Sequence, residues 1–197
     1  MKILGLSLVL VVSLGLAVQA RAAGADTRRG VAARRTEGRA MSFTLHSAAF
    51  DPGAEIPRAH TCEGADVSPP LAWSGAPAGT RSFALVVDDP DAPDPAAPKV
   101  DWVHWVLYDI PAGVHAMPHH MIPRMLPPGA REGLNDWKAR GWRGPSPPRG
   151  RHRYFFRLHA LDVVLGDLRS PDRAALEQAM QGHVLGTAEL MGTYQRK

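Results

Sequence analysis

Residues 82–109 read SFALVVDDPDAPDPAAPKVDWVHWVLYD, and this stretch decides the fold class. Residues 82–88 and 103–109 are rich in Val, Leu, Phe, Tyr and Trp, the side chains that pleated and half-buried strands favour. The prolines between the two runs prevent a helix, because proline lacks a backbone N–H and fixes φ. The stretch therefore predicts two strands of an antiparallel β domain, separated by a stiff loop.

The same pattern continues on both sides of this stretch. Ser42 to His46 and Tyr154 to Leu161 are short apolar or aromatic runs bounded by turn residues, so they predict two further strands. The eighteen prolines of the chain crowd the connections at residues 90–98, 123–128 and 145–148. Long and stiff loops of this kind commonly carry function, so they are the candidate locations of a functional site.

The chain beyond residue 169 changes to a helical pattern. Ser170 can cap a helix, and Pro171 suits the first helical position. Apolar side chains then recur near one helical face, at Leu176, Met180, Val184 and Met191. Gly182 and Gly186 weaken the stretch, so we expect one or two short C-terminal helices that pack on a sheet.

The first forty residues carry a targeting pattern. An apolar run from Ile3 to Val18 precedes small residues, which predicts that residues 1–22 are a signal peptide. Residues 23–40 are rich in Arg, Gly and Ala, and they predict a flexible tether before a folded domain at residues 41–197. We expect export to the periplasm or beyond, cleavage, and no stable membrane insertion afterwards. An uncleaved anchor and a true start at Met41 are the alternatives.

Composition and charge are those of one soluble globular domain. Hydrophobic residues make up 45% of the chain and charged residues 21%. Seven of the 23 basic and two of the 19 acidic residues precede residue 41, which leaves 16 basic and 17 acidic residues in the domain. A near-neutral domain predicts no nucleic-acid partner. Cys62 is the only cysteine, which excludes an intramolecular disulfide, and we expect its thiol to be buried.

Polar and titratable residues gather where the predicted strands end. Asp89 and Asp91 follow the first strand, and an Asp before Pro is held in extended or turn geometry. His104 lies inside an aromatic strand, where period-two alternation places it on one face with Val106 and Tyr108. A buried histidine of this kind needs a hydrogen-bond partner.

The last predicted core strand brings two more such residues. His152 and Tyr154 are two apart, so they project from one face. If the strands meet, Asp89, His104, His152 and Tyr154 form a small concave site with donors for an anion. At about pH 6.5 each imidazole is partly protonated, while Asp89 orients one ring and repels a dianion. We therefore expect modest anion affinity that improves at acid pH.

Three motifs in order resemble the signature set of a known family. DPDAP at 89–93, WVHW at 102–105 and GPSPPRGRHRY at 144–154 are similar to those of the phosphatidylethanolamine-binding protein family. The match is to its bacterial Raf-kinase-inhibitor-like branch, the YbhB/YbcL type, and extends over residues 42–196. The resemblance implies a mainly β fold of two antiparallel sheets packed together, with one or two C-terminal helices. It also implies a shallow pocket for phosphate-like groups or small carboxylates.

The resemblance assigns roles to individual residues. Asp89 is the acidic residue that faces the pocket, and Asp91 from the same turn shapes its wall. His104 supplies one imidazole. His152 supplies the second, and Tyr154 supplies a phenol. These five side chains are candidate ligand-binding residues, and the resemblance implies no catalytic group among them.

The proline-rich loop completes the implied site. Ser146, Pro147 and Pro148 form a rigid loop over the pocket, and Ser146 stands where many bacterial relatives carry Cys. A thiol-dependent role of the loop is therefore not expected here. We expect a binding protein rather than an enzyme, without a cofactor, whose ligand is phosphate, a phosphoethanolamine-like headgroup or a carboxylate. A protein partner, such as a kinase or protease that it modulates, and a homodimer stay open.

Two other kinds of site compete with anion binding. Ser146, His152 and Asp89 supply a nucleophile, a base and an orienting group for a small-molecule hydrolase. Ser146 lies in GPSPP, however, and not in the G-x-S-x-G turn that presents such a serine. His104, His152, Asp89 and Asp91 are acceptable zinc ligands, but their spacing matches neither H-E-x-x-H nor C-x-x-C.

Overall fold

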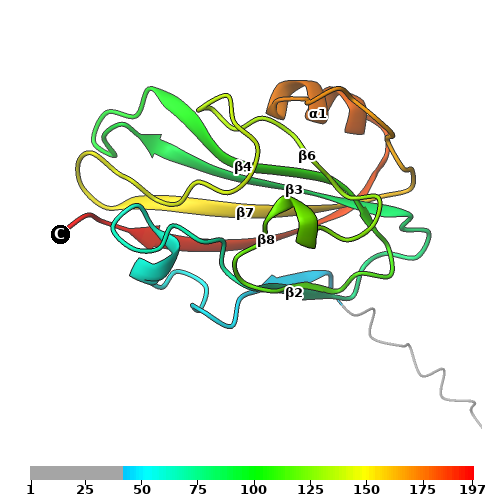
Figure 1. Ribbon diagram of the computed structural model, residues 1–197, viewed down its shortest axis with the longest axis horizontal. Helices are drawn as coiled ribbons and strands as arrows, with labels where there is room; N and C mark the ends of the chain where they lie inside the picture. The colour runs from blue at the N-terminus through cyan, green and yellow to red at the C-terminus, as the bar shows by residue number, and fades with distance from the viewer. Residues whose placement is uncertain (1–41) are drawn as a thin grey trace, which may run out of the picture. The chain divides into compact units, whose positions relative to one another are not determined.

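The computed structural model describes residues 42–197, so the predicted signal peptide and tether lie outside the described residues. Two antiparallel sheets make up most of this domain (Figure 1). The smaller sheet has the order β1-β2-β5, with bounds Thr44–His46, Leu71–Ser74 and Ala116–Met117. The larger sheet has the order β6-β4-β3-β7-β8, with bounds Arg131–Glu132, Val100–Pro111, Ser82–Ala92, His152–Leu161 and Val184–Tyr194. The predicted mainly β class with two sheets is confirmed.

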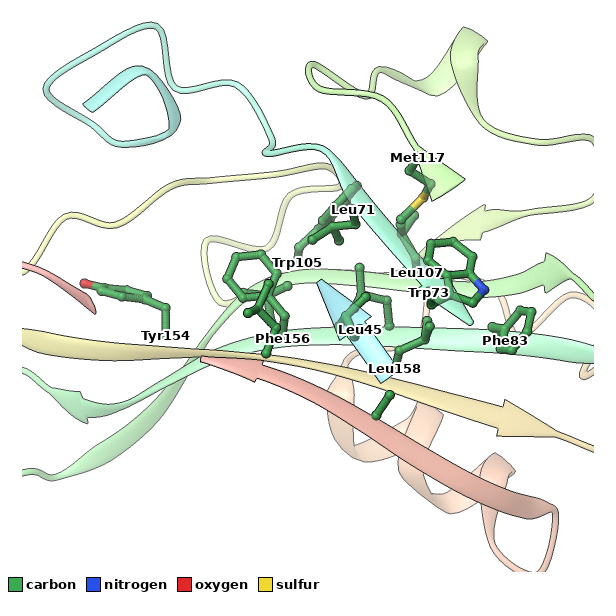
Figure 2. Close-up of a cluster of buried hydrophobic side chains, with 14 of the residues drawn as sticks. Leu45, Leu71, Trp73, Phe83, Trp105, Leu107, Met117, Tyr154, Phe156 and Leu158 are labelled. Carbon is green, nitrogen blue, oxygen red and sulfur yellow. The ribbon is translucent and has the colours of Figure 1, made fainter. Parts of the chain in front are cut away.

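The centre of the larger sheet is buried on both faces. β3 shows this most clearly: Phe83, Leu85 and Val87 enter one core cluster, whereas Ala84 and Val86 enter the other. The first cluster lies between the two sheets (Figure 2). The second lies under the helix α1. A strand covered on both sides has a continuous apolar sequence, and for this reason SFALVVD predicted a strand.

The helix α1 (Arg173–Met180) packs on the face of the larger sheet opposite to the smaller sheet (Figure 1). Asp172 caps it, because its carboxylate accepts a hydrogen bond from the backbone N–H of Ala175 at 3.0 Å. The expectation that Ser170 is the cap is wrong, since the helix begins three residues later. Two 3₁₀ turns, η1 (Arg58–His60) and η2 (Pro123–Met125), complete the helical elements of residues 42–197, in which no helix is long and apolar enough to cross a bilayer.

The expected helical continuation through Val184 and Met191 is wrong, because these residues belong to β8. This strand pairs with β7 along its whole length, from Tyr194 opposite His152 to Val184 opposite Leu161. Its buried positions alternate in the second half, at Ala188, Leu190, Gly192 and Tyr194. Pairing with a strand far away in the sequence therefore overrides the local helical spacing.

A bulge in β4 decides where His104 points. Trp105 pairs with β3 in register, but the next paired residue of β4 is Val103, so one residue is extra. Val103 consequently packs in the core cluster under α1 together with Val106, while the ring of His104 contacts Tyr154 of the other cluster. The expected alternation, which put His104 on the face of Val106, is wrong.

Cys62 lies in the turn that follows η1, and its side chain is exposed. The expectation of a buried thiol is therefore wrong. Cys62 contacts the rest of the domain through its backbone, because its N–H donates to the carbonyl of Pro145 at 3.1 Å. This bond joins the turn to the proline-rich loop at residues 144–148.

Candidate ligand-binding site

A cavity of about 520 Å³ opens where the ends of β3, β4 and β7 meet the proline-rich loop. Six of the eight predicted site residues line it: Asp89, His104, Ser146, Pro147, Pro148 and His152. These residues come from segments up to 63 positions apart, which the antiparallel pairing of β3 with β4 and β7 brings together. Asp91 and Tyr154 do not line the cavity.

Asp89 and His152 form a buried pair beside this cavity. The imidazole Nδ1 of His152 lies 2.7 Å from Asp89 Oδ2, and its Nε2 lies 2.9 Å from the carbonyl oxygen of Arg149. Both partners are acceptors, so a doubly protonated ring satisfies both contacts by donating to each. The second oxygen of Asp89 accepts from the backbone N–H of Asp91 at 2.9 Å. In this arrangement His152 has no free ring nitrogen for a ligand.

His104 is the imidazole with spare capacity. Its Nδ1 donates to the carbonyl oxygen of Arg143 at 2.6 Å, and its ring meets those of Trp137 and Tyr154 edge-on, each with centroids 5.2 Å apart. Burial lowers the pKa of His104, against the opposing effects of the Arg143 carbonyl and the charge of Asp89. The neutral ring therefore carries its proton on Nδ1, and protonation at Nε2 adds a second donor.

Tyr154 is fully buried between the two imidazoles, and Figure 2 shows its hydroxyl pointing away from the core cluster. Within residues 42–197 this hydroxyl has no hydrogen-bond partner. Burial, followed by the charge and the nearness of the Asp89 carboxylate, raises the pKa of Tyr154, so the phenol stays protonated, although no acceptor lies at hydrogen-bond geometry in the described domain. The indole N–H of Trp102, a residue that lines the cavity, is likewise buried without an acceptor in the described domain. Buried donors left unpaired are costly and usually mark a missing partner.

Asp91 is engaged elsewhere. Its carboxylate accepts hydrogen bonds from Arg153 through Nε at 2.9 Å and Nη2 at 2.7 Å, and through the backbone N–H at 2.9 Å. The guanidinium of Arg153 lowers the pKa of Asp91. Asp91 thus fixes the end of β3 to the start of β7 and holds Asp89 in place through its own backbone N–H.

Comparison with known proteins assigns the chain to a family. The sequence model described as "Phosphatidylethanolamine-binding protein" matches residues 46–195. The chain belongs to the phosphatidylethanolamine-binding protein family. The UPF0098 protein of Methanothermobacter thermautotrophicus is 44% identical over 155 residues, which cover 78% of this chain and 99% of the relative. The UPF0098 protein of Chlamydia trachomatis is 39% identical over 156 residues, with coverage of 77% and 98%.

Solved structures agree with the family assignment. A putative phosphatidylethanolamine-binding protein homologue from Chlamydia trachomatis has a TM-score of 0.73 and 38% identity, and covers 79% of this chain and 99% of its own. YbcL of Escherichia coli, described as a new member of the mammalian family, has a TM-score of 0.71 and 35% identity with the same coverage. The resemblance inferred from the three motifs is confirmed, and the chain is a family binding protein of the UPF0098 type.

The cavity of this family member also contains residues that sequence reasoning missed. Trp137 packs edge-on against Trp102, with ring centroids 5.3 Å apart, and Lys99 is the one Lys or Arg among the lining residues. Trp137 is positioned by its neighbour Asp136, whose carboxylate accepts from the backbone N–H of Val103 at 2.8 Å. The sequence offered one signal for Trp137, since it is an aromatic side chain in the otherwise polar stretch REGLNDWK.

The geometry of the cavity also tests the two alternatives to anion binding, a hydrolase site and a metal site. Ser146 lines the cavity, but Nε2 of His152 faces the carbonyl of Arg149, so His152 is not placed to take a proton from a serine. For the metal alternative, the part of the chain from residue 42 onward holds no group of three or more His, Cys, Asp or Glu side chains arranged around one point. Neither arrangement favours hydrolase or metal chemistry over binding.

Proposed function

We propose that this family member binds a small molecule through a phosphate or carboxylate group held beside His104 and Tyr154. The observation that carries the proposal is the pair of buried donors, the hydroxyl of Tyr154 and the indole N–H of Trp102, that lack acceptors in the described domain. Anionic oxygens are pure acceptors, so they complement these donors. The apolar part of the ligand lies along Trp102 and Trp137, which line the same cavity.

Charge in the cavity predicts which anions bind best. The buried carboxylate of Asp89 lies beside the cavity and repels negative charge, so a monoanion meets less repulsion than a dianion. Lys99 adds a positive charge at the cavity wall. Because burial holds His104 neutral, an anion that binds next to it favours uptake of a proton at Nε2. Affinity therefore rises as the pH falls.

Export is the second part of this proposal. It is supported by the apolar run from Ile3 to Val18 and by the small residues that follow it. Mass spectrometry of the mature N-terminus tests it: a chain that begins near residue 23 supports export and cleavage. A chain that retains residue 1 after membrane fractionation points to an uncleaved anchor instead.

Calorimetry tests the binding proposal. Phosphate, phosphoethanolamine and acetate are titrated into the protein at about pH 5.5 and about pH 7.5, with ethanolamine as a ligand that lacks the anionic group. We expect dissociation constants in the micromolar to millimolar range for the anions, severalfold tighter at the lower pH, and none for ethanolamine. The absence of heat from all three anions at both pH values contradicts the proposal.

A further inference from the structure

A second cavity, of about 380 Å³, lies on another part of the domain. It is formed by β4, β6, the η2 region and the loop before α1, and it shares no lining residue with the first cavity. Its size is within the range of small-molecule pockets. Apolar side chains from residues 123–130 form one wall, and the charged groups Arg131, Glu132, Arg140 and Asp167 form most of the rest.

Glu132 is a buried carboxylate with few partners. Only 8% of the residue is exposed, and its one hydrogen bond within the described domain comes from the indole N–H of Trp105 at 3.3 Å. Burial raises the pKa of Glu132, because a single long bond does not replace the water that the charged form loses. An ionised carboxylate accepts about four hydrogen bonds, so Glu132 can accept more from a group in the cavity.

Arg140 is a cation without a carboxylate partner. Its guanidinium donates to the hydroxyl of Ser170, and no Asp or Glu among residues 42–197 lies within ion-pair distance of it. The positive charge of Arg140 nevertheless lowers the pKa of Glu132, against the effect of burial. Arg131, by contrast, has carboxylates within 3.8 Å at Asp109 and 3.9 Å at Asp167. Arg140 is therefore the free anion-binding group of this cavity.

We propose that the second cavity binds a small zwitterion such as a free amino acid, with the ammonium group on Glu132 and the carboxylate on Arg140. Guanidinium groups hold carboxylates through paired N–H donors, and an ammonium group supplies the three donors that a poorly satisfied carboxylate needs. A ligand with only one of the two charges leaves either Glu132 or Arg140 without a partner. This proposal does not depend on the ligand of the first cavity.

The indole N–H of Trp105 reports on this site directly, because it donates to Glu132. We would titrate the ¹⁵N-labelled protein with glycine, β-alanine and 4-aminobutanoate, which place the two charges at increasing separations, and follow the indole resonances. Trp105 is expected to shift with at least one of the three, and any shift of Trp102 would report separate binding of the carboxylate group in the first cavity. Methylammonium is expected to bind at least tenfold more weakly, and acetate to shift Trp102 instead.

Two variants and a matched control define the site. Glu132→Gln and Arg140→Met should each weaken the best zwitterion at least tenfold, whereas Arg124→Met on η2, which does not line the cavity, should leave it unchanged. Arg140 is exposed, so Arg140→Met should fold normally and can test the proposal even if Glu132→Gln fails to fold. The proposal is overturned if Trp105 stays in place with all three zwitterions up to about 10 mM, well above a weak millimolar constant. It is also overturned if Arg140→Met binds like the unaltered protein.

Discussion

Asp89 Oδ2 and His152 Nδ1 lie 2.7 Å apart, and both side chains are almost fully buried. The pair joins the end of β3 to the start of β7, although the two residues are 63 positions apart in the chain. Because Asp89 and His152 satisfy one another, they build the cavity wall rather than offering free groups to a ligand. Recognition is left to His104, Tyr154 and Trp102, which have unused hydrogen-bonding capacity.

Asp89→Asn tests the structural value of this pair. The substitution removes the negative charge that faces the His152 ring, and hydrogen bonds to charged groups contribute about 1.5–3 kcal/mol. We expect urea unfolding to show a loss of about 1.5–3 kcal/mol. Asp51→Asn, at an exposed position, should change stability by less than about 0.5 kcal/mol. Equal effects of the two substitutions would mean that the buried pair contributes nothing specific.

Tyr154→Phe separates ligand binding from folding. The hydroxyl of Tyr154 is buried without a partner in the described domain, so its removal should leave the free energy of unfolding unchanged or raise it by up to about 1 kcal/mol. Phosphate affinity should fall about fivefold, the value of one hydrogen bond of about 1 kcal/mol. Tyr194→Phe, which loses a bond to Glu63, should instead cost about 1 kcal/mol of stability. A large loss of stability in Tyr154→Phe is the contrary result.

His104 predicts a specific pH dependence of stability. Burial lowers its pKa below the ordinary value of 6.5, so in mildly acid solution the unfolded chain binds a proton that the folded chain does not. The free energy of unfolding therefore falls as the pH drops through this window, by at most about 1.4 kcal/mol per pH unit from this group. Urea unfolding of His104→Gln between about pH 7.5 and 5.5 should show a flatter dependence.

Burial also lowers the pKa of His159, which therefore serves as the control for this experiment. His159→Gln should retain the part of the slope that His104 supplies, and saturating phosphate should flatten the slope of the unaltered protein. Identical slopes in His104→Gln and the unaltered protein would show that this imidazole does not resist protonation.

Gly192→Ala tests the strand assignment of β8. A Cβ at this position would lie 2.6 Å from Ile56 Cγ1 and 2.8 Å from Phe50 Cε2, both in the core. Overpacking of this kind costs about 1–3 kcal/mol, which thermal or urea unfolding would detect. Gly113→Ala has open space around it and should be neutral or slightly stabilising. A neutral Gly192→Ala would argue against the close packing of β8.

The sequence was sufficient for the elements whose apolar runs are long. β3 and β4 were predicted because strands buried on both faces need continuous Val, Leu and Phe, and β7 because its buried face carries Tyr, Phe and Leu at alternate positions. β2, β5 and β6 have only two to four residues each, too short for any period to show. β8 was mistaken for a helix because its Leu, Met, Ala and Glu suit helices locally. Its strand conformation depends on pairing with β7, which local spacing does not encode.

The site was predicted in composition but not in detail. The three motifs contain nine of the twelve residues that line the cavity, and six of these nine, including Asp89 and His152, were predicted site residues. The direction of His104 depends on a bulge that arises from the pairing of β4 with β3. Trp137 is held at the cavity by contacts such as that of its neighbour Asp136 with Val103, across 33 positions. Tertiary pairing determines both features, so neither periodicity nor motif spacing revealed them.

The central claim is that an anionic group accepts hydrogen bonds from the unpaired donors beside the first cavity. The most direct measurement is a phosphate titration that follows the indole ¹H–¹⁵N resonance of Trp102 in the unaltered protein and in Tyr154→Phe. The account predicts a saturable shift of Trp102 at about pH 5.5, with an affinity about fivefold weaker in the variant. A Trp102 resonance that does not move, or equal affinities in the two proteins, would contradict it.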